Sequence, residues 1–176
     1  MKILVTGGVR SGKSAHAESL LRGHEAVTYV APGPRPDADT DPDWAARVAA
    51  HRDRRPATWT TRETRDLATA VAQAPGTVLI DCLGTWLAGF LDEEQAWEAP
   101  ADEVQELVEG RLVGLAAALT ETPHPVVVVT NEVGMGIVPE HRSGRLFRDL
   151  LGTANQRVGA ACDAVHLVVS GRVLVL

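Results

Sequence analysis

The sequence has few cysteines and no excess of positive charge. Only two of its 176 residues are cysteine, and 23 Asp and Glu residues against 17 Lys and Arg give a formal net charge of −6. A broad basic surface for nucleic acid or anionic lipid is therefore missing. Cys82 and Cys162 lie far apart, without the spacing of a disulfide framework or a zinc site. We expect a reduced, cytoplasmic protein that binds no nucleic acid.

Long apolar runs are also absent. No run of about 18 apolar residues occurs, and the apolar part of "MKILVTGG" is too short for the core of a signal peptide. We therefore expect no stable insertion into a membrane. The chain is long enough to bury a hydrophobic core and has no internal repeat, so we expect a single domain over residues 1–176 with one main site.

Short apolar runs rich in Val and Ile alternate with stretches of helical composition. Runs that are continuously apolar indicate strands buried on both faces. The predicted strands are residues 2–7, 26–31, 77–83, 124–133 and 164–170. The predicted helices are residues 13–22, 43–55, 63–74, 101–121 and 142–161. This alternation favours an α/β fold, with a mostly parallel β-sheet flanked by helices. The ending "VHLVVSGRVLVL" predicts a C-terminal antiparallel hairpin around Ser-Gly.

A phosphate-binding loop is predicted at residues 7–14, "GGVRSGKS". The segment matches G-x-x-x-x-G-K-[ST], with an apolar strand before it and a helical stretch after it. In such a loop backbone N–H groups surround phosphate oxygens at a helix N-terminus. We expect Lys13 to bind the β and γ phosphates and Ser14 to ligate Mg²⁺. The other expected phosphate contacts are Gly7, Gly8, Val9, Arg10, Ser11 and Gly12.

Polar residues follow two further predicted strands. Asp81 ends the run in "VLIDC", the usual place of a carboxylate that orients Mg²⁺; capping of the next helix is the alternative. Asn131 and Glu132 follow "VVVVT", and ligands of open α/β sheets bind beyond the carboxyl ends of strands. These two residues are expected either in the same crevice or in a plain turn. To this point the sequence indicates a Mg²⁺-dependent nucleoside-triphosphate enzyme or switch, and does not define the acceptor.

The stretch "ARVAAHRDRRP", residues 46–56, places His51 among four arginines. Pro56 ends the predicted helix, and helical spacing puts His51 beside the apolar stripe of Trp44 and Val48. On spacing alone, a histidine packed at the edge of the core is favoured over a reactive one. The arginines shift this balance, because they attract a triphosphate and favour the neutral imidazole that acts as a nucleophile.

Several motifs together resemble one family, the bifunctional adenosylcobinamide kinases/adenosylcobinamide-phosphate guanylyltransferases of cobalamin biosynthesis. The similar stretches are "ILVTGGVRSGKSAHAE", "ARVAAHRDRRPATWTTRE", "LIDCLGTWL" and "VVTNEVGMGIVPEHRSGRLFRDLLGTANQRVGAACDAVHLVVSG". They cover nearly the whole chain. The resemblance implies a RecA-like P-loop domain that assembles as a homotrimer, with active sites near the subunit boundaries.

The resemblance also implies two reactions. The γ-phosphoryl group of ATP or GTP passes to a hydroxyl of adenosylcobinamide. A histidine then attacks the α-phosphorus of GTP, expels pyrophosphate and passes GMP to the phosphorylated corrinoid. In the family this histidine lies in H-x-x-x-R-P before W-x-T-x-E, which here is His51. The resemblance also implies that Glu63 contacts the nucleotide and that Asp81 lies near the phosphates or the metal. Arg52, Arg54 and Arg55 are expected as phosphate contacts because of their charge, with their individual roles left open. A kinase of another small molecule and a regulatory switch without transfer chemistry are the alternatives, and neither needs the histidine pattern.

The chain departs from the usual family pattern in two places. Segment 32–43, "PGPRPDADTDPD", is longer and richer in proline, and Asp43 and Trp44 replace an acidic-Met pair. The remaining conspicuous side chains are expected to be structural. They are His16 in the loop helix, Trp86 and Trp97 in the core, and Arg142, Arg145, Arg148 and Arg157 on a solvated helix face. For the two tryptophans the alternative is an apolar surface for the corrinoid or a partner subunit.

Overall fold

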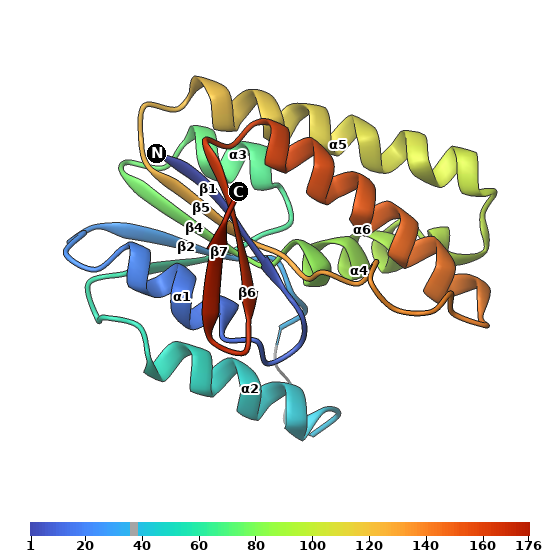
Figure 1. Ribbon diagram of the computed structural model, residues 1–176, viewed down its shortest axis with the longest axis horizontal. Helices are drawn as coiled ribbons and strands as arrows, with labels where there is room; N and C mark the ends of the chain where they lie inside the picture. The colour runs from blue at the N-terminus through green and yellow to red at the C-terminus, as the bar shows by residue number, and fades with distance from the viewer. Residues whose placement is uncertain (36–38) are drawn as a thin grey trace.

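The computed structural model describes residues 1–35 and 39–176, and its centre is one seven-stranded sheet (Figure 1). The strand order is β3-β2-β4-β5-β1-β6-β7. Neighbouring strands are parallel except for the antiparallel pair β6 and β7, which confirms the α/β prediction and the terminal hairpin. The strands are β1 (Lys2–Gly7), β2 (Val27–Ala31), β3 (Thr60–Glu63), β4 (Thr77–Asp81), β5 (Val126–Val129), β6 (Ala164–Val169) and β7 (Arg172–Val175).

Helices cover both faces of the sheet. They are α1 (Lys13–Leu20), α2 (Pro42–Asp53), α3 (Leu67–Ala72), α4 (Leu83–Glu93), α5 (Ala101–Glu121) and α6 (Arg142–Ala160), with a short 3₁₀ turn at Ala96–Glu98. Helices α3 to α6 lie on one face and α1 on the other, with α2 outside α1 (Figure 1). Side chains of β5 alternate between the two cores: Val126 and Val128 pack with α3 to α6, and Val127 and Val129 with α1. The continuous apolar run is therefore explained by burial on both faces.

The sequence prediction missed one strand, β3, and one helix, α4. Residues 63–74 were expected to be one helix, but edge strand β3 ends at Glu63 and α3 begins only at Leu67. Helix α4 was not predicted, and it begins at Leu83, within the expected strand 77–83. Both α4 and β4 are buried and apolar, so no change of periodicity marks the boundary between them.

The predicted strand 124–133 is also shorter in the structure, since β5 covers only Val126–Val129. The hairpin turn shortens β6 by one residue, because Ser170 and Gly171 have φ values of 48° and 76°. A two-residue turn with both φ values positive matches the right-handed twist of the strands. Within the described ranges, no helix is both long and apolar enough to cross a membrane.

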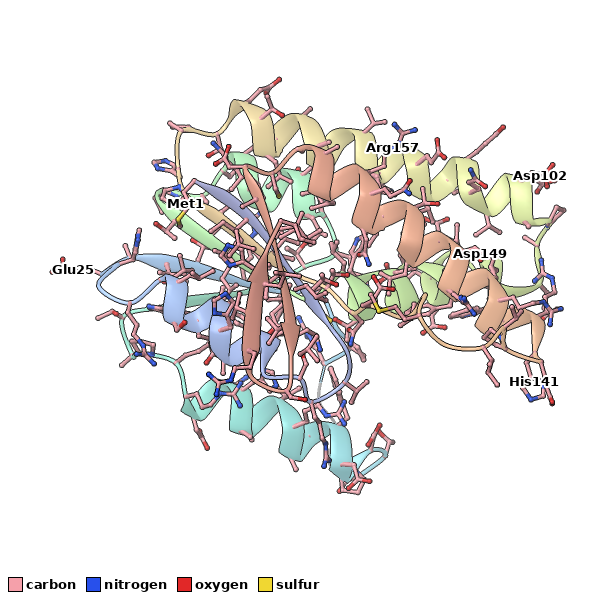
Figure 2. All side chains as sticks on the ribbon, viewed as in Figure 1. Met1, Glu25, Asp102, His141, Asp149 and Arg157 are labelled. Atoms are coloured by element: carbon pink, nitrogen blue, oxygen red, sulfur yellow. The ribbon has the colours of Figure 1, made fainter. Side chains whose placement is uncertain are left out.

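Some side chains expected to be plain surface or packing groups have specific partners. His16 Nε2 on α1 lies 2.9 Å from His166 Nδ1 on β6. Arg157, labelled in Figure 2, lies beside α5 with its Nη2 3.6 Å from Glu109 Oε2. Arg142 donates to backbone carbonyls of the segment after α4. The expected solvated face of α6 thus also binds neighbouring parts of the chain.

Candidate active site

The predicted phosphate-binding loop joins β1 to α1 at the carboxyl edge of the sheet. Arg10 and Gly12 have positive φ values of 57° and 98°, and Gly12 caps α1 without a side-chain hydrogen bond. The first turn of a helix leaves N–H groups without partners in the helix, and these groups attract anions. Lys13 Nζ donates to the Gly8 carbonyl at 3.2 Å, so its ammonium group lies over the loop. This backbone is suited to hold phosphate.

The terminal hairpin supports this loop. The Gly171 N–H in the hairpin turn donates to the Ser11 carbonyl at 2.8 Å. A Cβ atom at Gly7 would collide with the Val168 carbonyl oxygen, so no side chain fits at position 7. The hydroxyl of Ser11 is buried and has no hydrogen-bond partner among the described residues. The loop is thus held from the β6 side by backbone contacts.

Helix α2 carries His51, and none of its residues is fully buried. The helix begins with Pro42, and Asp41 Oδ1 accepts a hydrogen bond from the Trp44 N–H at 2.8 Å. Trp44, Val48 and His51 are half-buried, which places the histidine on the same stripe as the two apolar residues. This stripe faces the carboxyl edge of the sheet, because its last member reaches the end of β4.

His51 meets the predicted metal-orienting carboxylate. His51 Nδ1 lies 3.6 Å from Asp81 Oδ2, and the exposed fractions of the two side chains are 28% and 8%. This distance is longer than that of a hydrogen bond. Nδ1 is on the Asp81 side, so Nε2 is the ring nitrogen that remains for other chemistry. The charged group beside the His51 imidazole is therefore a carboxylate, whereas the sequence around His51 drew attention only to arginines.

Tyr29 on β2 connects Asp81 with the arginine cluster. Its hydroxyl donates to Asp81 Oδ2 at 3.2 Å, the same oxygen that faces His51. The Arg55 guanidinium carbon lies 3.7 Å from the centre of the tyrosine ring, a cation–π contact. Burial, and then the charge of Asp81, raise the pKa of Tyr29 well above its ordinary value of 10. The phenol therefore stays protonated and able to donate.

The arginines after His51 are divided between several partners. Arg54 Nε and Nη2 lie 3.4 and 3.2 Å from the two carboxylate oxygens of Glu18 on α1, which joins α2 to the loop helix. Arg55 Nε donates to the His51 carbonyl at 2.9 Å, and its Nη1 to Thr61 Oγ1 at 3.0 Å. Arg52 is exposed. The arginines are therefore close to the site, but two of them bind protein groups.

Asn131 and Glu132 lie beyond the end of β5, between the ends of β4 and β1. Cys82 Sγ lies 3.7 Å from Asn131 Oδ1, which places Asn131 next to the residue after Asp81. The Glu132 N–H donates to the Gly7 carbonyl at 3.1 Å, while Glu132 Oε1 accepts from the Gly134 N–H at 2.6 Å. The Glu132 side chain thus caps its own turn, and its backbone supports the phosphate-binding loop.

Glu63 lies at the edge of the sheet. It ends β3, the edge strand, and β2 separates that strand from β4. Glu63 Oε2 lies 3.3 Å from Arg35 Nε, so the carboxylate is held at the carboxyl edge by a residue of the segment after β2.

The donor set at the site is of the kind that binds Mg²⁺ together with a nucleotide. Among the described residues no group of three His, Cys, Asp or Glu side chains is arranged to hold a metal. Nucleotide-bound Mg²⁺ takes one or two protein ligands, and phosphates and water supply the rest. The Ser14 hydroxyl and the Asp81 carboxylate are hard oxygen donors that fit this requirement.

Comparison with known proteins identifies the family. Residues 3–176 match the family described as cobinamide kinase / cobinamide phosphate guanyltransferase. The chain belongs to this family. It is 42% identical over 181 residues to the bifunctional adenosylcobalamin biosynthesis protein CobU of Salmonella typhimurium, with 97% of both chains covered. The Escherichia coli protein of the same name is 40% identical at the same coverage. A Pseudomonas aeruginosa relative, CobP, is 36% identical over 97% of this chain and 94% of its own.

The fold of this cobinamide kinase / guanyltransferase chain is also found elsewhere. An ATPase from the type III secretion system of pathogenic bacteria superposes with a TM-score of 0.59 at 12% identity. The match covers 94% of this chain and 50% of the ATPase. At this identity the likeness concerns the fold alone, and it confirms the RecA-like P-loop architecture.

Two residues of the candidate site were missed by the sequence analysis. Tyr29 is the only tyrosine of the chain and lies in a buried strand, so a phenol in a mostly apolar strand was the available signal. Glu18 lies four residues after Ser14 on α1, at the spacing that puts both on one side of the helix. Its partner Arg54 is 36 residues away, and no local pattern joins them.

Proposed function

We propose that this chain phosphorylates adenosylcobinamide with ATP or GTP and then transfers GMP from GTP to the product through a guanylyl group on His51. The family and its bifunctional relatives support the two reactions. The observation that carries the residue assignment is the 3.6 Å approach of His51 Nδ1 to Asp81 Oδ2, at the same sheet edge as the phosphate-binding loop. A kinase of another small molecule, or a nucleotide switch, needs no histidine at that place.

For the kinase step, we assign phosphate binding to the backbone of residues 7–12 and to Lys13. Ser14 and Asp81 are the residues that would hold Mg²⁺, and their oxygen donors support this role. When bound, the ion neutralises charge on the β and γ phosphates. The loop geometry and the N-terminus of α1 support the placement of the triphosphate.

For the second reaction, Nε2 of His51 is the attacking nitrogen. Its lone pair forms a bond to the α-phosphorus of GTP, while the bond to the bridging oxygen breaks and pyrophosphate leaves with the electron pair. Asp81 on the Nδ1 side orients the ring and stabilises the positive charge that develops on it. A phosphate oxygen of the phosphorylated corrinoid then attacks the same phosphorus, and the P–N electron pair returns to Nε2.

The surrounding polar residues receive roles from their position. We assign phosphate contacts to Arg52, Arg54 and Arg55, which follow the nucleophile directly. Glu63 is assigned to the N1–H and N2–H₂ donors of guanine, which a carboxylate accepts. Arg54 binds Glu18 in this structure, and we assign it to a phosphate in the complex. Its positive charge and its exposed fraction of 43% support both contacts.

The assembly and the location rest on the family resemblance. We propose a homotrimer of cytoplasmic chains, each acting as one domain over residues 1–176. Large apolar side chains at the surface support subunit contacts, among them Met135, Ile137 and Leu174, which are 80%, 95% and 57% exposed. Light scattering coupled to size-exclusion chromatography tests the trimer, and a monomeric mass would contradict it.

The decisive experiment is labelling with Mg²⁺ and GTP that is radioactive at the α-phosphate, followed by denaturation. We expect acid-labile label on the protein, since a phosphoramidate hydrolyses in acid. His51→Ala loses the label, whereas His141→Ala, altered at the far end of α6 (Figure 2), keeps it. Label retained in His51→Ala would refute the nucleophile. Lys13→Ala is expected to abolish phosphorylation of adenosylcobinamide, and unchanged kinase turnover would exclude Lys13 as a required phosphate ligand.

A further inference from the structure

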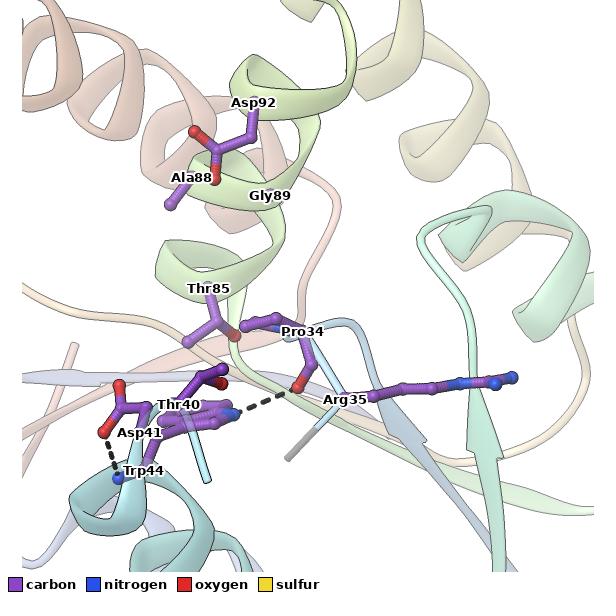
Figure 3. A pocket seen from close by; sticks show the side chains of 9 residues that line it. All are labelled: Pro34, Arg35, Thr40, Asp41, Trp44, Thr85, Ala88, Gly89 and Asp92. Atoms are coloured by element: carbon purple, nitrogen blue, oxygen red, sulfur yellow. Dashed lines mark hydrogen bonds between the residues drawn. The ribbon is translucent and has the colours of Figure 1, made fainter. Parts of the chain in front are cut away.

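A pocket of about 360 Å³ lies beside the candidate site, between α2, α4 and residues 34–35 and 40–41 (Figure 3). Trp44 and Pro34 form part of one side. Thr85, Ala88 and Asp92 line the other, and their spacing places them on one face of α4. None of these residues has a role in the phosphate or histidine chemistry assigned above.

The tryptophan in this pocket is held in place. Trp44 Nε1 donates to the Pro34 carbonyl at 3.0 Å (Figure 3). A Cβ atom at Gly33 would lie only 2.9 Å from the Trp44 ring and 3.6 Å from Thr85 Cβ. The absence of a side chain at Gly33 thus lets the indole pack closely against the chain. Because its position is fixed before any ligand arrives, the indole face costs little entropy to use in binding.

The pocket is aligned with His51. Trp44 and His51 are seven residues apart on α2, which is nearly two helical turns, so both point to the same side of the helix. The rise between them is about 10 Å. His51 faces Asp81 at the end of β4, and Trp44 packs near Thr85 in the first turn of α4, which follows that strand. A substrate that reacts at His51 therefore reaches the pocket if it extends about 10 Å along α2.

The charges of the pocket select hydrogen-bond donors rather than phosphate. Asp41 and Asp92 are both in the lining. Trp97 Nε1 donates to Asp92 Oδ1 at 2.6 Å, which orients that carboxylate. Arg35, the one cation among the described residues of the lining, is paired with Glu63 and extends away from the other lining residues (Figure 3). Two carboxylates beside an aromatic ring suit an uncharged ligand that carries N–H groups and apolar surface.

We propose that this pocket binds the corrin end of the acceptor, with amide side chains of the corrinoid donating to Asp41 and Asp92 and the ring edge packing on Trp44. Cobinamide is a corrin ring that carries primary amides, which supply both features. Its phosphorylated arm then points along α2 to His51. For the second reaction this inference rests on the proposed guanylyl group at His51. Guanine is the other ligand with N–H donors, but Glu63, assigned to guanine, is not in the lining.

The test fills the pocket and measures each substrate separately. Ala88→Leu adds three carbons at the α4 wall, and Ala117→Leu makes the same change at an exposed position of α5. In the kinase reaction with ATP, we expect Ala88→Leu to raise the KM for adenosylcobinamide about tenfold or more, the scale for a few misplaced methylene groups. The control keeps the wild-type KM. The KM for GTP in self-labelling is expected to rise in neither variant.

The outcomes separate this inference from the proposed function. A wild-type KM for adenosylcobinamide in Ala88→Leu would overturn the pocket, and a rise confined to GTP would assign the pocket to guanine instead. Absence of label in the unaltered protein would refute the guanylyl-histidine, yet the kinase KM would still test the pocket.

Should Ala88→Leu fail to fold, Asp92→Asn and Asp41→Asn give a second test. Both are isosteric, and Asn still caps α2. Loss of a charge-assisted acceptor is expected to raise the KM for adenosylcobinamide roughly fivefold in each. Unchanged values in both would also overturn the proposal.

Discussion

Replacing Tyr29 by Phe tests whether the reaction at His51 requires the hydrogen bond that Tyr29 donates to Asp81. The tyrosine hydroxyl donates to Asp81 Oδ2 at 3.2 Å, and Arg55 lies 3.7 Å above the ring. Phenylalanine keeps the ring under Arg55 and removes only the hydrogen bond. Asp81 is 8% exposed, so water replaces the lost donor poorly. The change therefore isolates one interaction at the centre of the candidate site.

The expected loss follows from the charge of the acceptor. A hydrogen bond to a charged group contributes about 1.5 to 3 kcal/mol, compared with about 1 kcal/mol for a neutral pair. For a chain of this length, about 2 kcal/mol lowers the melting temperature by about 4 to 8 °C. Each 1.4 kcal/mol that is also lost in the transition state slows self-guanylylation about tenfold. We expect both effects, because the same oxygen faces Nδ1 of His51.

The assay compares Tyr29→Phe with Thr77→Val in thermal unfolding and in the rate of labelling by α-labelled GTP. Thr77 is buried at the other end of β4, where its hydroxyl pairs with His24 at 2.8 Å. Valine there should lower stability and leave labelling unchanged. If Tyr29→Phe labels at the wild-type rate, or if Thr77→Val slows labelling equally, Tyr29 does not act by positioning Asp81.

The pH dependence of stability provides a second test of Tyr29. The pKa of Tyr29 is raised in the folded protein, so the folded state keeps a proton that the unfolded chain loses above about pH 10. Stability contributed in this way is complete below pH 10 and falls as the pH rises further. Tyr29→Phe should therefore show a shallower loss of stability above pH 10 than the unaltered protein, and an identical slope would contradict the buried, protonated phenol.

Three other changes test contacts farther from the reacting atoms. Glu18→Gln removes the charge that Arg54 binds. We expect the interaction between α2 and α1 to lose up to about 1 kcal/mol, which slows labelling up to about fivefold. An unchanged rate would show that this pair does not hold α2. Burial lowers the pKa of both His16 and His166, so stability is complete above about pH 6.5 and falls on acidification. His16→Gln should flatten this dependence between pH 7 and 5 in urea titrations, and an unchanged profile would refute it. Trp86→Ala leaves a cavity at a core position that is 2% exposed, and should lower the unfolding free energy by about 3 to 5 kcal/mol. A loss under about 1 kcal/mol would contradict the packing.

The central sheet was predictable because its strands are buried on both faces. Val126 to Val129 read as a continuous apolar run, and the structure sends alternate side chains into the two cores. The edge strand β3 escaped prediction for the opposite reason, since its residues are mostly exposed and it contains no apolar run. Helix α4 is so apolar that its sequence continues that of β4 without a visible break. Prediction thus failed at both extremes of burial, where hydrophobic periodicity is lost.

The phosphate-binding loop and His51 differ in what the sequence can show of them. The loop is a local pattern, because strand, glycines, lysine and helix follow one another within residues 2–20. The position of His51 depends on tertiary contacts, since α2 has no fully buried residue. It is fixed by polar contacts of the helix end, Arg54 with Glu18 and Arg55 with Tyr29, which pair residues more than 25 positions apart. Helical spacing correctly placed His51 beside Trp44 and Val48, yet it indicated a packing role. The stripe of Trp44, Val48 and His51 covers the carboxyl edge of a parallel sheet and not a closed core. At this edge Asp81 ends β4 and the phosphate-binding loop follows β1, so the stripe brings His51 to the candidate site.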